Sequence, residues 1–200
     1  MVVTISGASG VGKTTIEKSL LKRLPNAEIV ISFTTREKRD NDNPGEYRHI
    51  SKLWFRLLDK FGAFLWTVSV HGNWYGTLEI SVRKALKNYD GISLMILVPE
   101  RVKNLLDYAK GCGSEECVLS FYILSPSPAT LRKRLQSRGD NESEIVKRIT
   151  DCDRWDEEAR KAVFNGSIPY IFIKNDTDDS EDAVDDMISC IDEKMSERLF

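Results

Sequence analysis

Short apolar runs alternate with amphipathic segments along most of the chain. Runs rich in β-branched and other apolar residues predict strands at residues 2–6, 28–33, 94–98, 118–124 and 170–173. Segments with apolar residues three or four positions apart predict helices at residues 14–24, 51–60, 101–110 and 128–138, and from about residue 180 onward. Strands that alternate with helices are typical of an α/β fold, in which helices cover both faces of a parallel sheet.

The segment after the second predicted strand has a different character. Residues 51–60 predict a helix that begins at a Ser51 cap and turns Trp54 inward. Residues 62–75 are rich in β-branched and aromatic residues, and the turn His71-Gly72-Asn73 interrupts them. This pattern predicts further strands, outside the simple alternation of the rest of the chain.

Composition adds limits on partners and location. In 200 residues, 41% are hydrophobic and 30% are charged, the balance of an ordinary globular domain. The net charge of −2 provides no broad basic field, so no nucleic-acid partner is expected. No apolar stretch approaches the roughly 18 residues of a membrane helix, and the apolar strand from Val2 argues against a secretory leader. The scattered cysteines are typical of reduced thiols, and we expect a cytoplasmic protein without a membrane partner.

The first strand and the first helix are joined by a phosphate-binding motif. Residues 7–14 match GxxxxGK[ST] in full. Its glycines let backbone N–H groups wrap a phosphate chain, and the next helix directs its positive end at the same anion. Lys13 then reaches the β- and γ-phosphates, and Thr14 offers a hydroxyl to Mg²⁺. The sequence therefore predicts ATP and Mg²⁺ as cofactors, with Thr14 as the metal ligand, bound by Gly7, Ser9, Gly10, Val11, Gly12, Lys13, Thr14 and Thr15.

A second cluster of anion-binding residues follows the strand at 28–33. Arg36 and Arg39 lie three positions apart beside hydroxyl side chains, and two guanidinium groups at this spacing fork onto a phosphate. Tyr47 and the segment 72–77 supply further hydroxyls. Together with the phosphate loop, the cluster predicts a second site for a phosphorylated acceptor.

The order of these motifs resembles the guanylate kinase family. That family has a loop of the form SGxSGxGK[ST], then S-x-T-T-R-x-x-R, then a glycine-rich turn to a tyrosine and a G-N-x-Y-G-[ST] segment. The matching segments here are residues 6–14, 32–39, 45–47 and 72–77. Further along, Arg134, Arg138 and Lys147-Arg148 are similar to the family's lid, and Asn175-Asp176 to its adenine-side element.

The resemblance implies one domain over residues 1–200. Its core would comprise residues 1–33 and 89–200, with a parallel sheet between helices. A small α/β insertion that binds the monophosphate would occupy about residues 34–88, and an Arg-rich lid about residues 136–148. The polar stretches 38–46 and 137–143 predict loops in these two parts.

The resemblance also implies roles for matching residues. The groups around the transferred phosphoryl would be Lys13, Arg39, Arg134, Arg138 and Arg148. The acceptor would be held by Ser32, Arg36, Arg39, Tyr47 and Tyr75, with Trp66 and Thr77 near its base. Asn175 would join the ATP site.

Two positions depart from the family pattern. Guanylate kinases read guanine partly through two carboxylates; here Trp66 replaces one, and the strand at 94–98 contains no aspartate. A site that hydrogen-bonds the edge of a base discriminates strongly between bases, whereas an apolar wall discriminates between them weakly. Glu79 and Glu100 are the alternative acceptors for a base edge.

Three functions remain open at this point. The first is transfer of a phosphoryl group from ATP to a nucleoside monophosphate, GMP or dGMP. The second is the same chemistry on a different or modified nucleotide or on a sugar phosphate. The third is a guanylate kinase-like binding module, a class that has usually lost the phosphate loop. Small-molecule nucleotides are the expected partners, and protein partners stay undefined.

Overall fold

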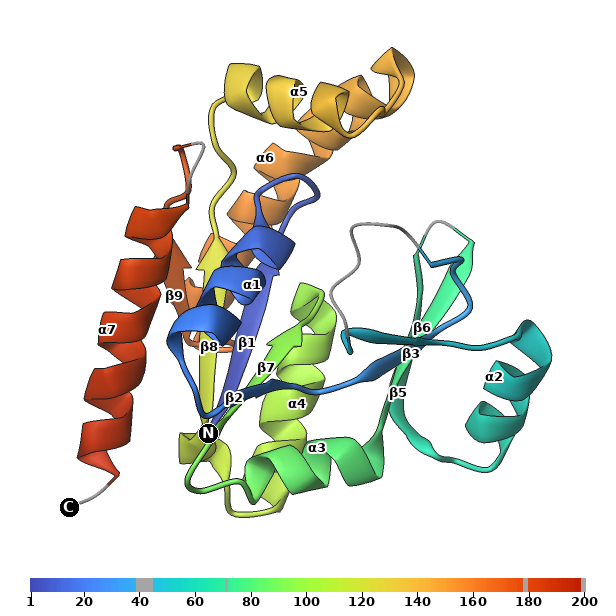
Figure 1. The fold of residues 1–200 in the computed structure, drawn as a ribbon, viewed down its shortest axis with the longest axis vertical. Coiled ribbons are helices and arrows are strands. Elements are labelled where there is room, and N and C mark those ends of the chain that lie inside the picture. Colours follow the sequence, from blue (N-terminus) through green and yellow to red (C-terminus); the bar gives the residue numbers. More distant parts are fainter. Residues whose placement is uncertain (39–44, 71, 178–179, 199–200) are drawn as a thin grey trace.

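The core of the molecule is a parallel sheet between two layers of helices (Figure 1). The computed structural model describes residues 1–38, 45–70, 72–177 and 180–198. The strand order is β2-β7-β1-β8-β9, and every neighbouring pair is parallel. The strands are β1 (Val2–Gly7), β2 (Ala27–Ile29), β7 (Ile92–Ile96), β8 (Val118–Ile123) and β9 (Tyr170–Ile173). The α/β fold class predicted from the alternation is confirmed.

Alternate residues of β1 enter two separate apolar layers. Val3 and Ile5 pack with residues of α1 (Lys13–Arg23) and α7 (Glu181–Glu197). Val2 faces the opposite way, into the layer formed by α3 (Glu79–Leu86), α4 (Pro99–Gly111) and part of α6 (Glu142–Phe164). Because successive side chains of a strand point to opposite faces, a strand buried on both sides reads as one continuous apolar run.

A second, smaller sheet projects from one edge of the core (Figure 1). Its order is β4-β3-β6-β5, with β3 parallel to β4 and the other pairs antiparallel. We call this sheet and its helix α2 (Lys52–Lys60) the insertion. The strands are β3 (Ser32–Thr34), β4 (Tyr47–His49), β5 (Phe64–Val70) and β6 (Asn73–Leu78).

The strand predicted at residues 28–33 is in fact two strands in different sheets. β2 pairs with β7 of the core, and Val30 N–H still donates to Leu94 O at 2.9 Å. From Ser32 the chain pairs instead with β4 and β6 of the insertion. The apolar run is continuous because both sheets bury it, so hydrophobicity alone could not reveal the change of sheet.

The loop predicted at residues 137–143 is shorter than expected. Helix α5 (Pro128–Ser137) and helix α6 flank a few residues only, and Asn141 caps α6 by accepting a hydrogen bond from Glu144 N–H at 2.9 Å. Most of the loop predicted at 38–46 lies outside the described residues. A 3₁₀ turn, η1 (Glu115–Cys117), precedes β8.

Helix α2 buries a different residue from the one predicted. Ser51 caps it, accepting from Trp54 N–H at 3.3 Å as expected. However, Trp54 is 62% exposed, and Phe55 is buried instead, stacked on Phe64 with ring centroids 4.6 Å apart. The side of the helix that the sheet covers, not residue size, decides which aromatic ring is buried. In the part of the chain that the structure describes, no helix is long and apolar enough to cross a membrane.

Candidate active site

The phosphate loop leaves the carboxyl end of β1 in a shape that needs glycine. Gly10 and Gly12 have φ angles of 93° and 101°, where other residues are strained. A Cβ at Gly12 would lie 2.4 Å from Asn175 Nδ2, an impossible approach. Asn175 itself is buried and donates through Nδ2 to Val11 O at 2.7 Å. The loop and the chain after β9 therefore hold each other in place.

Lys13 folds back over this loop. Its Nζ donates to Gly7 O at 2.8 Å and to Ala8 O at 2.7 Å. Burial of the ammonium, and next the positive charge of Arg138, lower the Lys13 pKa from 10.5 to about 8. The charge of Arg138, an exposed side chain, acts on the partly buried Lys13 ammonium, and a polyanion bound beside Lys13 would offset both charges.

The Lys13 pKa predicts a pH dependence for donor binding. The ammonium, which is the phosphate-binding form, predominates below about pH 8 and is lost as the pH rises through that value. We expect kcat/KM for ATP to fall correspondingly, since this ratio reports groups of the free enzyme. In Lys13→Arg the side chain stays charged over this range, so the residual kcat/KM of the variant should not fall as the pH rises through about 8. A wild-type profile that stays flat between about pH 7 and pH 9 would contradict the assignment.

Arginines of α5 and α6 reach the phosphate loop and the chain next to it. Arg148, near the start of α6, donates to Ser9 Oγ at 2.8 Å and pairs with Asp140 at 3.3 Å. Arg134 of α5 donates to the carbonyls of Asn175 at 3.1 Å and Val11 at 3.4 Å. Arg134 thus supports the walls of the donor site, whereas Arg148 lies at the loop itself.

A cavity of about 320 Å³ opens beside the loop, between α5 and the chain after β9. The sequence predictions missed Lys133, Ser137 and Ser180, which line it together with Gly10, Gly12, Thr15, Arg134, Arg138 and Asn175. Lys133 and Ser137 could have been found from helical spacing, because they lie on the same face of α5 as the predicted residues Arg134 and Arg138. The lining combines cations, hydroxyls and an amide, which suits a nucleoside with attached phosphates.

The predicted acceptor residues converge on one face of the insertion sheet. Ser32 lies opposite both Tyr47 and Thr77 in the register, and Thr34 lies opposite Tyr75. The hydroxyls of Ser32 and Thr77 are 3.1 Å apart. We call this surface the acceptor face. Arg39 lies outside the described residues, so its placement stays a prediction.

Arg36 and two tyrosines form the polar end of the acceptor face. The Arg36 guanidinium carbon is 5.3 Å from the centroid of the Tyr47 ring, and Tyr47 meets Tyr75 edge-on with centroids 5.9 Å apart. Burial, and next the Glu46 carboxylate, raise the Tyr47 pKa above its ordinary value. Tyr47 therefore keeps its proton, and its hydroxyl donates a hydrogen bond to the Glu46 carboxylate.

Carboxylates at the junction of the insertion and α1 were not assigned a role from the sequence. Glu46 is 7% exposed and its charge acts on both Lys13 and Tyr47. Glu17, one turn after Lys13 on α1, is fully buried and also acts on Tyr47. These interactions place the acceptor face next to the first turns of α1. The only sequence signal was an acidic residue beside the motif tyrosine.

Trp66 lies beside the acceptor face but is packed rather than open. It faces Thr77 across the β5–β6 pair and is only 7% exposed. Its indole belongs to the apolar layer that contains Met95 and Leu97 at the end of β7. A tryptophan in this position closes the end of the acceptor face with an apolar wall.

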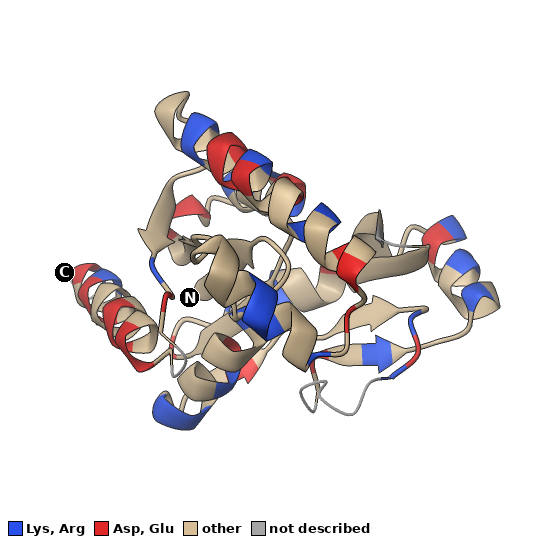
Figure 2. Cartoon of the chain, turned by 90° about the horizontal axis from the view of Figure 1, so that it is seen from above, with Lys and Arg blue, Asp and Glu red and all other residues tan. Residues whose placement is uncertain are grey.

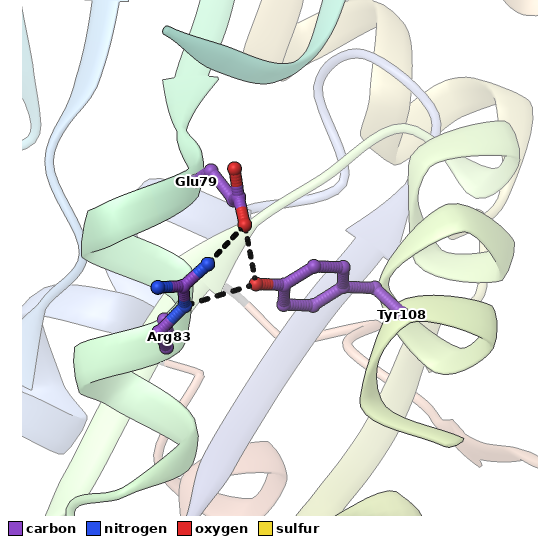
Figure 3. A network of polar contacts seen from close by, with 3 residues as sticks. All are labelled: Glu79, Arg83 and Tyr108. Carbon is purple, nitrogen blue, oxygen red and sulfur yellow. Dashed lines mark hydrogen bonds and ion pairs between the residues drawn. The ribbon is translucent and has the colours of Figure 1, made fainter. Parts of the chain in front are cut away.

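Glu79 is already engaged elsewhere. Its carboxylate accepts a hydrogen bond from Tyr108 Oη of α4 at 3.0 Å and pairs with Arg83 (Figure 3). These hydrogen bonds lower the Glu79 pKa, the Tyr108 contribution being the largest. Glu79 therefore connects α3 to α4 at the base of the insertion. Glu100, the other alternative acceptor, is exposed in the first turn of α4.

Charge at the site is local rather than global. Helix α7 carries mostly Asp and Glu among its charged residues, whereas other helices such as α6 carry both signs (Figure 2). Within residues 1–38, 45–70, 72–177 and 180–198, no three His, Cys, Asp or Glu side chains form a metal-binding group. Thr14 lies in the first turn of α1, next to Lys13, and its role as a Mg²⁺ ligand stays a prediction.

Comparison with known proteins agrees with this geometry. The sequence matches the guanylate kinase family model over residues 1–193. A guanylate kinase of Aromatoleum aromaticum is 30% identical over 193 residues, which cover 95% of this chain and 86% of that protein. One of Carboxydothermus hydrogenoformans is 36% identical over 165 residues, or 78% of each chain. The crystal structure of guanylate kinase from Anaplasma phagocytophilum shares the fold, with a TM-score of 0.69 at 20% identity over 98% of this chain and 86% of that one. The chain belongs to the guanylate kinase family.

Proposed function

We propose that this protein transfers the γ-phosphoryl group of ATP to GMP or dGMP, giving ADP and GDP or dGDP. The observation that carries the proposal is the adjacency of two anion sites. The charge of Glu46, next to Tyr47 on the acceptor side, acts on Lys13 of the phosphate loop, and buried Glu17 of α1 acts on Tyr47. A donor on the loop and an acceptor on the acceptor face would thus meet at the first turn of α1.

The chemistry demands positioning and charge more than covalent help. An oxygen of the acceptor phosphate attacks the γ-phosphorus, and the bond from that phosphorus to the β–γ bridging oxygen breaks. Lys13, Arg138 and Arg148 would offset the negative charge on the transferred group, with Arg39 predicted to join them. Arg36, Tyr47 and Tyr75 would orient the acceptor phosphate by hydrogen bonds. Bound Mg²⁺, held by the Thr14 hydroxyl, would supply further charge neutralisation.

The end of α5 and the start of α6 would act as a lid. Arg148 contacts Ser9 from α6, and Arg138 at the end of α5 acts on Lys13, so both bring charge to the loop from the same side. Closure over ATP would exclude water, which otherwise competes with the acceptor for the phosphoryl group. The 136–148 region is our proposed lid on this basis.

One observation favours a second candidate acceptor. Trp66, Met95 and Leu97 make the end of the acceptor face apolar, and Glu79 is bound to Tyr108 and Arg83. A site without a carboxylate at the edge of the base discriminates only weakly between different bases. The second candidate is therefore the same phosphoryl transfer to a different or modified nucleotide, or to a sugar phosphate.

A coupled ADP-release assay separates these functions. ATP and Mg²⁺ are supplied with GMP, dGMP, AMP, CMP, UMP, dTMP or a sugar phosphate, one at a time. Selective turnover of GMP or dGMP supports the first proposal, and selective turnover of another acceptor supports the second. A Lys13→Ala preparation purified in the same way corrects for contaminating kinases. Folded protein that binds ATP and phosphorylates no acceptor would contradict both.

A further inference from the structure

A second cavity, of about 420 Å³, lies on the far side of the insertion sheet. It is walled by α2, by β5 and by the first turn of α4. Thr67, Val68 and Ser69 of β5 line it, and Thr67 and Ser69 pair across the sheet with Gly76 and Trp74, whereas Trp66 pairs with Thr77. Because neighbouring side chains of a strand point to opposite faces, this cavity and the acceptor face are on opposite sides of the same sheet.

Two guanidinium groups from different parts of the molecule line this cavity. Arg56, on α2, stands over the Trp74 ring with its guanidinium carbon 5.2 Å from the centroid. Arg101, on α4, donates to Asn104 at 2.8 Å, but its Nε is buried without a hydrogen-bond partner. The ion pairs between described residues include neither arginine.

This arrangement favours an anion. Arg56 and Arg101 line the same cavity, and neither forms an ion pair with another described residue, so a bound anion would offset the charge of both. The Trp74 ring holds Arg56 in place beforehand, so little side-chain freedom is lost when it binds. A phosphate group is the anion whose oxygens best match guanidinium donors.

The other polar residues of the lining define the rest of the ligand. Asp59 presents a carboxylate, and Ser69 and Thr67 present hydroxyls. A carboxylate repels a bare phosphate but accepts hydrogen bonds from sugar hydroxyls. The volume lies in the range of small-molecule sites. We propose that this cavity binds a phosphorylated polyhydroxy compound of about the size of a pentose phosphate, at a site separate from both nucleotide sites.

A ligand here would connect the insertion to the core. Arg56 belongs to the insertion, whereas Arg101 belongs to the core, so a phosphate bound by both favours one relative placement of the two parts. The acceptor face belongs to the insertion and the phosphate loop to the core, so a change in that placement would alter the acceptor site. Ligand and acceptor therefore influence each other's affinity by the same factor. This coupling rests on the proposed function; binding to the cavity does not.

Fluorine NMR of protein labelled with 5-fluorotryptophan tests the proposal. Trp74 reports the cavity and Trp66 the acceptor face, and Trp→Phe variants assign the two signals. Ribose 5-phosphate, inorganic phosphate and ribose are titrated separately. We expect ribose 5-phosphate to shift the Trp74 signal saturably, at lower concentration than phosphate, and ribose to leave it unchanged.

Variants then locate the binding. Arg101→Ala and Arg56→Ala should each raise the Kd reported by Trp74 about tenfold or more, the effect of one charge-assisted hydrogen bond. Arg48→Ala is the matched control, because Arg48 stands over Phe33 on the same side of the sheet but does not line the cavity. Unchanged Trp54 and Trp155 signals show that each variant is folded.

Three outcomes would overturn the proposal. The first is a Trp74 signal that no probe moves. The second is a shift that persists unchanged in Arg101→Ala and Arg56→Ala, which would place the ligand at the acceptor face. The third is equal affinity for phosphate and ribose 5-phosphate, which would leave a simple anion site without recognition of the polyol.

Discussion

Lys13→Ala should lower kcat for phosphoryl transfer by about a thousandfold while leaving the fold unchanged. Lys13 Nζ is held by two carbonyls of the loop and lies close enough to Arg138 for their charges to lower the Lys13 pKa. This ammonium is therefore fixed before ATP arrives, and its charge is available to the transition state without rearrangement. Removing it leaves a loop that still wraps the phosphates by its N–H groups but neutralises them less.

The measurement is kcat with the best acceptor from the nucleotide panel, with circular dichroism as the check on folding. Lys22→Ala is the matched control, since Lys22 lies exposed on the same helix, away from the loop. It should retain full activity. A Lys13→Ala enzyme within about tenfold of wild type would show that the transferred group is stabilised by other residues.

Trp66→Ala should lower the free energy of unfolding by about 3–5 kcal/mol. The indole is 7% exposed and packs in the layer that contains Met95, Leu97 and Val82, where the insertion meets the core. Its removal leaves a cavity that these residues, held by β7 and α3, can fill only in part. Urea denaturation followed by circular dichroism gives the change in free energy.

Trp54→Ala provides the comparison for this prediction. Trp54 is 62% exposed on α2, so the same substitution there should change stability by less than about 0.5 kcal/mol. If Trp66→Ala were as mild as Trp54→Ala, the indole would not be packed. It would then be free to stack on an acceptor base.

The two predictions together bear on substrate choice. The phosphate-binding parts of the site are hydrogen-bonded and charged, whereas the end next to Thr77 is closed by an apolar side chain. A change of residue 66 would therefore alter base recognition and stability at once. Substrate panels with the wild-type protein are consequently a cleaner test of specificity than substitution of Trp66.

Features that depend on a few consecutive residues could be predicted from the sequence. The phosphate loop is one, because its glycines determine the backbone path and Lys13 bonds to carbonyls only five and six residues away. The Ser51 cap and the strands of the core sheet are others, since capping and apolar runs are local signals. For the same reason, the alternation of strands and helices was enough to indicate an α/β fold.

Other features arise only when distant segments meet. Residues 28–33 read as one strand, yet they divide between two sheets because each half finds different partners. Trp66 is buried because β5 pairs with β6 and the sheet leans on β7 and α3. Arg134 turns to carbonyls of residues 11 and 175, and Glu79 to Tyr108, 29 positions away.

By itself, the sequence determined the phosphate loop and the fold class, because short-range spacing carries that information. The residues that would hold an acceptor phosphate stay a prediction that rests on the resemblance to guanylate kinases. The tertiary structure alone decided which carboxylates and aromatic rings are available to a ligand. Burial and hydrogen bonding between residues far apart in the chain set that availability, and no local pattern records them.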